Sequence, residues 1–235
     1  MTVTADDLDT AISSVVSALR PAASRDWSAR AGTLDWDCWH TTEHIGDCLL
    51  SYAAQLAARP AARYVRFLAS ADKDATPAEV LEFAEAGGRI LVAAVRTAPA
   101  HIRAYHPTGL ADPEGFAAMG CVEALLHGHD IARGLGVPLH PDRDTCRAVL
   151  TRLFPHTPDD LASTDPWETL QWATGRCSLP GHRQLQRWRW HGAPLDEMKS
   201  RGPETQTGCI SWQRADLRVT RQLLTAPHRW GHDHL

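Results

Sequence analysis

Four long stretches of the chain place apolar residues at helical spacing, and this periodicity constrains the fold more than any other feature. Residues 5–20 repeat Leu, Ile and Val every three or four positions and stop at Pro21, as an amphipathic helix does. Residues 39–59 carry a second apolar stripe that ends at Pro60. The segment 64–71 fits a short helix or a strand equally well. Because a helix with one apolar face needs a partner to cover it, these stretches predict helices that pack together.

The third and fourth stretches begin with residue types that start helices. Residues 76–79 read Thr-Pro-Ala-Glu, an N-cap followed by a proline and an acidic first turn. The helix that they open contains a glycine pair at 87–88, which we expect to be a weak point. Asp-Pro-Glu at 112–114 opens the fourth helix in the same way, and a glycine-containing segment at 134–138 ends it. Four such helices predict a four-helix bundle over residues 1–138.

The pattern changes after the fourth stretch. Residues 139–194 predict a small α+β region, with short helices at 143–154 and 167–174 and an alternating, strand-like segment at 186–191. Residues 195–235 show no pattern and are left unassigned. The predicted fold class is therefore mainly α, a four-helix bundle with a small α+β C-terminal extension.

Composition excludes several classes of protein. The chain has 235 residues and a net charge of −4, without a basic block, so it is a poor candidate for binding nucleic acid through phosphates. No run approaches the roughly 18 apolar residues of a membrane span. The N-terminus lacks the basic start and apolar core of a signal peptide. We expect a cytoplasmic protein that binds neither nucleic acid nor membrane; nothing indicates its oligomeric state.

The six cysteines are spread along the chain and form no Cys-x-x-Cys pair. This spacing predicts neither a disulfide framework nor a zinc knuckle, so we interpret them as reduced thiols, most of them in the core. They are Cys38, Cys48, Cys121, Cys146, Cys177 and Cys209.

Metal-ligating residue types occur at helical spacing in the second and fourth stretches. Glu123 and His127 are one turn apart and can converge on one ion, and Asp130 follows where it could support the ring of His127. His44 lies beside the apolar stripe of residues 39–59 and is expected to face the interior, with His40 as an alternative ligand. A Glu–His pair is also common on a solvated helix face, and a single histidine is usually a core or capping residue. The hypothesis of a metal site depends on the occurrence of His44 together with Glu123 and His127.

His44, Glu123 and His127 together supply two imidazoles and one carboxylate, and leave a coordination position open. That is the composition of catalytic zinc sites and of non-haem iron triads. A rival hypothesis is a metal-free thiol enzyme in which Cys48 or Cys121 acts as a nucleophile with His44. Buried cysteine is, however, usual in apolar helical stretches.

Other polar residues have weaker claims. His129 faces away from His127, which disfavours it as a ligand. Glu43 and Asp47 are positional candidates for the general base of a metal-assisted hydrolase. His228, His232 and His234 could bind metal adventitiously near the C-terminus. The remaining histidines are expected at the surface: His101, His106, His140, His156, His182 and His191.

These motifs resemble a known family. Trp36 followed after seven residues by His44, together with Glu123-x3-His127-x2-Asp130, looks like the DinB-type metal-binding bundles, and more narrowly like the mycothiol-dependent maleylpyruvate isomerases. The resemblance covers roughly residues 5–192.

The resemblance implies a DinB-like bundle with a divalent metal ion, zinc being expected, held by His44, Glu123 and His127. The segment 167–176, which ends in Gly-Arg, resembles a stretch of the same family, and this implies that Arg176 binds a carboxylate of a substrate. A surface arginine with a solvated partner is the alternative interpretation of Arg176. No residue is indicated as a catalytic acid or base.

The implied activity is that of a thiol transferase or isomerase which uses mycothiol, or a related low-molecular-weight thiol, on a small electrophile. A thiol is mostly protonated at neutral pH but ionises when it binds a divalent metal, and this agrees with the ligand set. The alternatives are a bundle that binds metal or a small ligand without catalysis, and a metal-assisted hydrolase. The sequence does not identify the electrophilic substrate.

Overall fold

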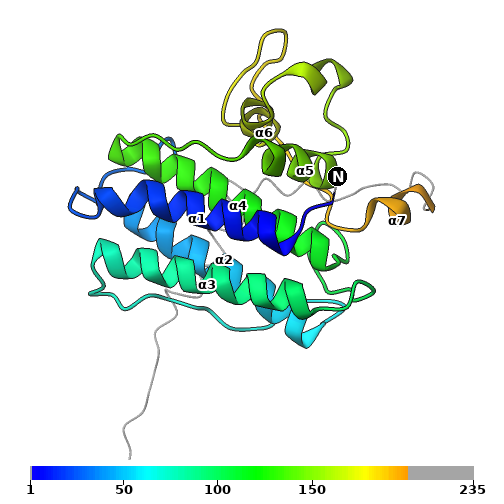
Figure 1. Cartoon of the computed structure of the whole chain (residues 1–235), viewed down its shortest axis with the longest axis horizontal. Coiled ribbons are helices and arrows are strands. Elements are labelled where there is room, and N and C mark those ends of the chain that lie inside the picture. Colours follow the sequence, from blue (N-terminus) through cyan, green and yellow to red (C-terminus); the bar gives the residue numbers. More distant parts are fainter. Residues whose placement is uncertain (1, 201–235) are drawn as a thin grey trace, which may run out of the picture.

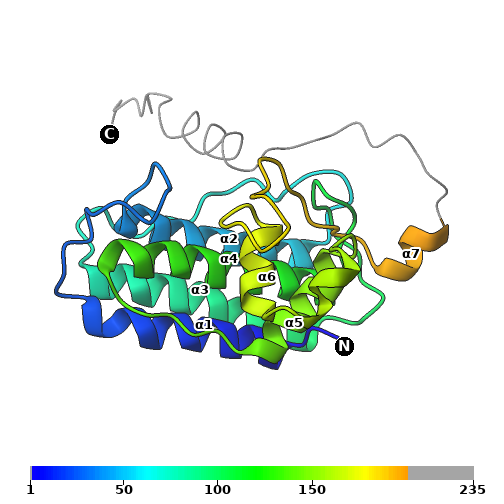
Figure 2. The same cartoon turned by 90° about the horizontal axis from the view of Figure 1, so that it is seen from above.

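Four long helices form a bundle in the structure, a computed structural model that describes residues 2–200, except for the side chains of 198–200. Figures 1 and 2 show these helices running side by side along the long axis of the molecule. α1 and α2 each pack against both α3 and α4, so the four surround one core. The helices are α1 (Ala5–Leu19), α2 (Cys38–Ala58), α3 (Pro77–Thr97) and α4 (Pro113–Leu135). The predicted helical bundle is confirmed at this level.

Side-chain caps fix where the helices begin. Thr76 accepts a hydrogen bond from the amide of Glu79, whose carboxylate in turn accepts from the amide of Thr76, so both unpaired donors are satisfied. Asp112 caps α4 through the amide of Gly115. α4 ends at Gly136 with a φ of 65°, a conformation that glycine adopts without strain. The predicted start signals of both helices are therefore confirmed.

The glycine pair of α3 is a packing feature and does not weaken the helix, contrary to expectation. α3 runs through Gly87 and Gly88 without a break. A Cβ at Gly87 would lie 2.9 Å from the carbonyl oxygen of Gly46 on α2, and a Cβ at Gly46 would collide with the ring of Phe83 on α3. The missing side chains let α2 and α3 approach closely, and the packing gained offsets the poor helix propensity of glycine.

The connection between α2 and α3 contains neither the helix nor the strand considered for residues 64–71. Its main chain is held by side chains of α2 instead. The buried amide of Gln55 accepts from the amide of Val65 at 2.8 Å and donates to the carbonyl of Tyr105 at 2.7 Å. Asp47 accepts from the amide of Ala69 at 2.9 Å. The amides of Val65 and Ala69 therefore donate to side chains of α2 and do not pair with a neighbouring strand.

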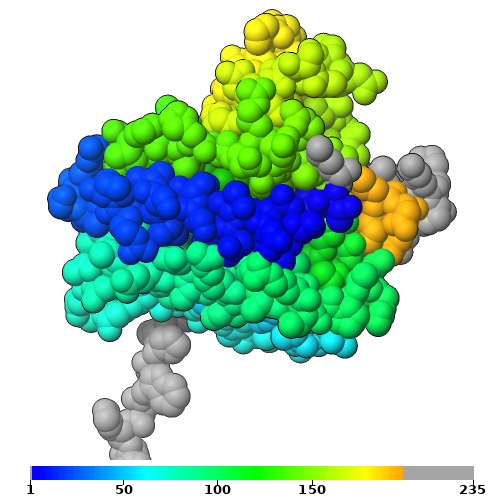
Figure 3. Space-filling view, in the orientation of Figure 1, coloured from blue at the N-terminus to red at the C-terminus, as the bar shows by residue number. Residues whose placement is uncertain are grey.

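The C-terminal region packs beside α4 (Figure 1) and projects from one face of the bundle (Figure 3). A buried ion pair helps to attach it: Arg152 Nη2 lies 2.8 Å from Asp112 Oδ1 and 3.0 Å from the carbonyl oxygen of Gly192. The elements after α4 are α5 (Arg143–Leu153), the 3-10 helix η2 (Asp159–Ser163), α6 (Pro166–Ala173) and α7 (Leu195–Ser200). Another 3-10 helix, η1 (Arg20–Ala22), follows α1.

The predicted α+β character of residues 139–194 is wrong, because residues 2–200 contain no strand. The alternation itself is genuine: Trp188 and Trp190 pack inward while Arg187 and Arg189 are exposed. Within the described residues, however, the segment has no partner strand; it bends at residues 186–187, and the amide of His191 donates to the carbonyl of Leu153 at 2.7 Å. Residues 195–235 carry no predicted structure; the structure places the helix α7 at their start, and residues 201–235 lie outside the described part.

Among the described residues, no helix combines the length and the apolar character needed to cross a bilayer.

Candidate metal centre

Two adjacent helices bring four ligand-type side chains to one place inside the bundle. His44 and Cys48 lie one turn apart on α2, and Glu123 and His127 lie one turn apart on α4. Residues four apart share a helix face, and α2 packs directly on α4, so both pairs meet at the interface of the two helices. We call these four residues the α2–α4 cluster.

The distances within the cluster are those of close contact. The carboxylate of Glu123 lies 3.3 Å from His127 Nε2, and Cys48 Sγ lies 3.5 Å from His44 Nε2. Ligand atoms of His44, Cys48 and Glu123 all lie within 4.8 Å of one another. The rings of His44 and His127 meet edge to face with centroids 5.1 Å apart. The three predicted ligands are thus neighbours, and Cys48 joins them.

Neighbouring groups hold the ligands in place. The hydroxyl of Tyr52, one turn beyond Cys48, donates to Glu123 Oε1 at 3.0 Å. The indole of Trp36 packs edge to face on His44 with ring centroids 5.0 Å apart. Glu123 is only 6% exposed, so its charge is largely removed from water and depends on these partners.

Asp130 and Arg176 continue the cluster on one side. Asp130 Oδ2 lies 3.7 Å from His127 Nδ1, beyond hydrogen-bond distance, and this buried nitrogen has no hydrogen-bond partner. The other ring nitrogen, Nε2, faces Glu123. Arg176 donates to the same Asp130 oxygen from Nη2 at 2.8 Å and from Nε at 3.2 Å. With 11% of its side chain exposed, Arg176 is a largely buried partner of Asp130 and not a solvated surface arginine. Binding of a substrate carboxylate by Arg176 stays a prediction.

The electrostatics favour the metal-binding protonation states of Glu123 and His44, but not that of His127. Burial alone would raise the pKa of Glu123, but its contacts with His127 and His44 lower it to about 2. Burial and the adjacent His127 lower the pKa of His44 to about 4. Burial alone would lower the pKa of His127, but Asp130 and Glu123 raise it above the usual value. At neutral pH, Glu123 is a carboxylate and His44 a neutral imidazole, which are the ligating forms. The raised pKa of His127 favours its protonated form, so a metal ion at this ring would have to displace a proton.

The donor set fits zinc. In a tetrahedral site, metal–ligand distances of about 2.05 Å for nitrogen and about 2.1 Å for oxygen place the two ligand atoms about 3.4 Å apart. The observed separation between Glu123 Oε2 and His127 Nε2 is 3.3 Å. A histidine whose other ring nitrogen faces a carboxylate, as His127 faces Asp130, is the usual arrangement at zinc.

Several residues considered from the sequence lie outside the cluster. His40 pairs with Asp37 at 2.8 Å at the exposed start of α2. The ring of His129 packs on Trp167 with centroids 5.4 Å apart, in agreement with its predicted direction. Asp47 binds the amide of Ala69. The group of converging ligand atoms consists of His44, Cys48 and Glu123, so it contains neither Asp47 nor Glu43, and it does not contain His127.

The cysteines divide into two kinds. Cys38, Cys121 and Cys146 are buried in the core, as expected, and burial raises the pKa of Cys121 well above its usual value. That thiol is a poor nucleophile, so this half of the metal-free hypothesis loses support. Cys48 and Cys177 are half-buried. No disulfide joins two of the five cysteines that the structure describes.

Two features of the site region were missed from the sequence. Tyr52 was placed only in an apolar stripe, and His106 was expected at the surface but is 2% exposed. The one available signal concerned Tyr52: eight residues after His44, and four after Cys48, it shares their face of α2. Nothing local marks His106 as buried.

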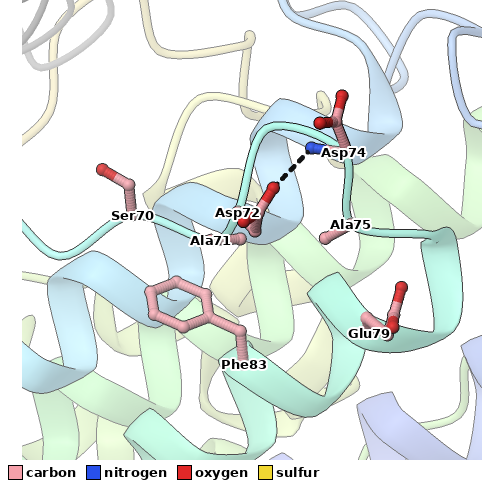
Figure 4. A pocket seen from close by; sticks show the side chains of 7 residues that line it. All are labelled: Ser70, Ala71, Asp72, Asp74, Ala75, Glu79 and Phe83. Atoms are coloured by element: carbon pink, nitrogen blue, oxygen red, sulfur yellow. Dashed lines mark hydrogen bonds between the residues drawn. The ribbon is translucent and has the colours of Figure 1, made fainter.

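A surface hollow of about 600 Å³ lies at the start of α3 and shares no residue with the cluster. Figure 4 shows Phe83 beside it and the carboxylate of Asp72 bonded to the amide of Asp74. The carboxylates of Asp72 and Glu79 accept hydrogen bonds from backbone amides close by in the sequence. The hollow therefore offers no set of converging ligands like that of the α2–α4 cluster. Its lining residues are Ser70, Ala71, Asp72, Asp74, Ala75, Glu79 and Phe83.

Fold and site together define a mainly helical bundle with a group of residues that could hold a metal ion. Comparison of the chain with models of protein families, with curated proteins and with solved structures found no match. The resemblance to the DinB-type bundles therefore depends on the motif residues alone.

Proposed function

We propose that this protein is a DinB-like, zinc-dependent thiol transferase or isomerase, which holds the metal at His44, Glu123 and His127 and uses mycothiol or a related thiol on a small electrophile. The observation that carries the proposal is the proximity of these three side chains at the α2–α4 interface: His127 lies 3.3 Å from Glu123, and its ring meets that of His44 edge to face. Two imidazoles and one carboxylate are the ligand set of zinc sites that keep a position for a substrate.

A thiol bound at zinc is deprotonated at neutral pH and becomes the nucleophile. The residues of this chain supply the surroundings for that chemistry. Glu123 brings one negative charge and accepts a hydrogen bond from the hydroxyl of Tyr52, and the carboxylate of Asp130 lies 3.7 Å from Nδ1 of His127. Arg176 adds a positive charge beside Asp130. An electrophile that carries a carboxylate could use the N–H groups of Arg176 that do not face Asp130.

The first test is metal content, measured by elemental analysis on full-length protein purified without chelators. We expect about one zinc per chain in the wild type and its loss in His44→Ala and His127→Ala. His129→Ala is the matched control, because His129 lies on the same helix but packs on Trp167. Replacing His228, His232 and His234 together by alanine removes adventitious binding near the C-terminus.

The second test is turnover. Metal-loaded protein should isomerise maleylpyruvate, used as the probe electrophile, in the presence of mycothiol, and removal of the metal should abolish the reaction. Activity that survives metal removal, or wild-type protein without zinc, would overturn the proposal.

One observation favours a second candidate, a bundle that holds metal without catalysis. Cys48 lies close enough to His44 to occupy the remaining coordination position, and sites with four protein ligands are usually structural. In that case metal would be bound at the same residues and no turnover would be seen. The hydrolase alternative has no such support, because Asp47 is bonded to the amide of Ala69.

A further inference from the structure

We propose that Cys48 is a fourth metal ligand, so that the α2–α4 cluster is a four-ligand centre closed by an internal thiolate. This inference depends on the proposed metal site at His44, Glu123 and His127, and it adds a ligand to that site.

The first argument is geometric. A tetrahedral zinc with a sulfur ligand at about 2.3 Å and a nitrogen ligand at about 2.05 Å places those two atoms about 3.6 Å apart. Cys48 Sγ lies 3.5 Å from His44 Nε2. With the contact of 3.3 Å between Glu123 and His127, two edges of the tetrahedron already have the required length, one on each helix. The ligand atoms of His44, Cys48 and Glu123 lie within 4.8 Å of one another, so small side-chain rotations would bring these three to ligating distances. His127 is outside that group and would join it through its contact with Glu123.

The second argument is the setting of the sulfur. The buried cysteines pack in the apolar core, whereas Cys48 is half-buried and faces an imidazole. The spacing of His44 and Cys48 is also that of a chelating pair on one helix face. A thiolate with two imidazoles selects zinc over magnesium or calcium, because the hard cations prefer oxygen.

The extra ligand changes how an external thiol could enter. The incoming thiol would have to replace Cys48: the metal–sulfur bond to Cys48 breaks, a new bond to the incoming sulfur forms, and the proton of that thiol passes to Cys48. No oxidation or reduction takes place. An internal thiolate therefore competes with the co-substrate and sets the concentration of external thiol that the protein needs.

Cobalt substitution tests the proposal by spectroscopy. Full-length protein is loaded with Co²⁺ in a buffer that contains a phosphine reductant and no thiol, and the near-ultraviolet charge-transfer band of cobalt–thiolate bonding is recorded. We expect the band in the wild type and its loss in Cys48→Ser, with about one cobalt still bound. Cys177→Ser, at a half-buried cysteine outside the cluster, and Cys209→Ser should keep it. Added 2-mercaptoethanol should restore the band in Cys48→Ser.

The outcomes separate this inference from the proposed function. One bound cobalt without the band in the wild type, or a band that persists in Cys48→Ser, would overturn the role of Cys48 and leave the three-ligand site intact. A wild type that binds no cobalt would overturn the metal site itself.

A second measurement avoids the variants, in case Cys48→Ser does not fold. The rate of iodoacetamide alkylation at Cys48, followed by peptide mass spectrometry in the wild type, should fall when zinc is added. The rate at Cys177 should not change. Equal rates at Cys48 with and without zinc would contradict ligation.

Discussion

His106 provides a test of the buried electrostatics close to the metal centre. It lies in the connection between α3 and α4, and its ring is surrounded by Tyr52, Tyr64 and Trp190, with centroids 5.8 to 6.1 Å away. Its Nδ1 accepts a hydrogen bond from the amide of Thr108 at 3.2 Å. Protonation of this nitrogen would place a charge in an apolar site and break that hydrogen bond. The structure therefore holds His106 neutral.

The magnitude follows from the two pKa values. Burial lowers the pKa of His106 from 6.5 to about 3, although the Glu123 carboxylate acts in the opposite direction. The unfolded chain therefore binds this proton more readily, so unfolding becomes easier as the pH falls from about 6.5 towards 3. At about 1.4 kcal/mol for each pH unit, linkage gives a loss of about 2 kcal/mol between pH 8 and pH 5, and of about 5 kcal/mol by pH 3.

The assay is urea unfolding of the wild type and of His106→Phe at several pH values between 8 and 5, with a chelator present throughout. The free energy of unfolding of the wild type should fall by about 2 kcal/mol more than that of the variant. Tyr64→Phe, which changes a ring packed on His106, is the matched control and should keep the wild-type dependence. Parallel curves for the wild type and His106→Phe would refute the reasoning.

Three further substitutions test the site and the packing. Tyr52→Phe removes the donor to Glu123 and should weaken zinc binding by about 10- to 100-fold in competition with a chromophoric chelator; an unchanged dissociation constant would show that the carboxylate needs no such support. Gly46→Ala forces a Cβ into the ring of Phe83 and should lower the free energy of unfolding by about 1–3 kcal/mol, so an unchanged urea midpoint would contradict the close helix contact. Arg152→Ala removes the positive charge beside the Asp112 carboxylate, which keeps only its hydrogen bond to the amide of Gly115, and should cost about 3–5 kcal/mol; a loss below about 1 kcal/mol would mean that water replaces the ion pair.

The sequence predicts the helices of the bundle because their signals are local. The caps at Thr76 and Asp112 and the left-handed glycine at 136 act within a few residues, so their effect can be predicted without the rest of the chain. The apolar stripes likewise indicate which faces meet. The pairing of Glu123 with His127 follows from the same logic, because one-turn spacing places residues on a shared helix face. That His44 meets them from α2 is a matter of tertiary packing.

Other features depend on partners that are distant in the sequence. Residues 186–191 alternate as a strand does, but a strand needs an edge to pair with, and none is present within residues 2–200. Gly87 and Gly88 predict a weak point because their packing partners are distant in the sequence: Gly87 lies against Gly46 of α2, and Gly88 lies against Ile12 of α1. Neither the absence of a partner strand nor the close packing at the glycine pair can be predicted from the local sequence.

For the candidate site, the sequence alone determined which residue types face the interior, since periodicity assigns each side chain to a helix face. Only the tertiary structure decided which side chains meet across the α2–α4 interface. Cys48 lies beside His44, and the hydroxyl of Tyr52 donates to Glu123. Arg176, from the C-terminal region, forms an ion pair with Asp130. Local propensity sets direction within one helix, whereas distances between helices depend on the packing of the whole core.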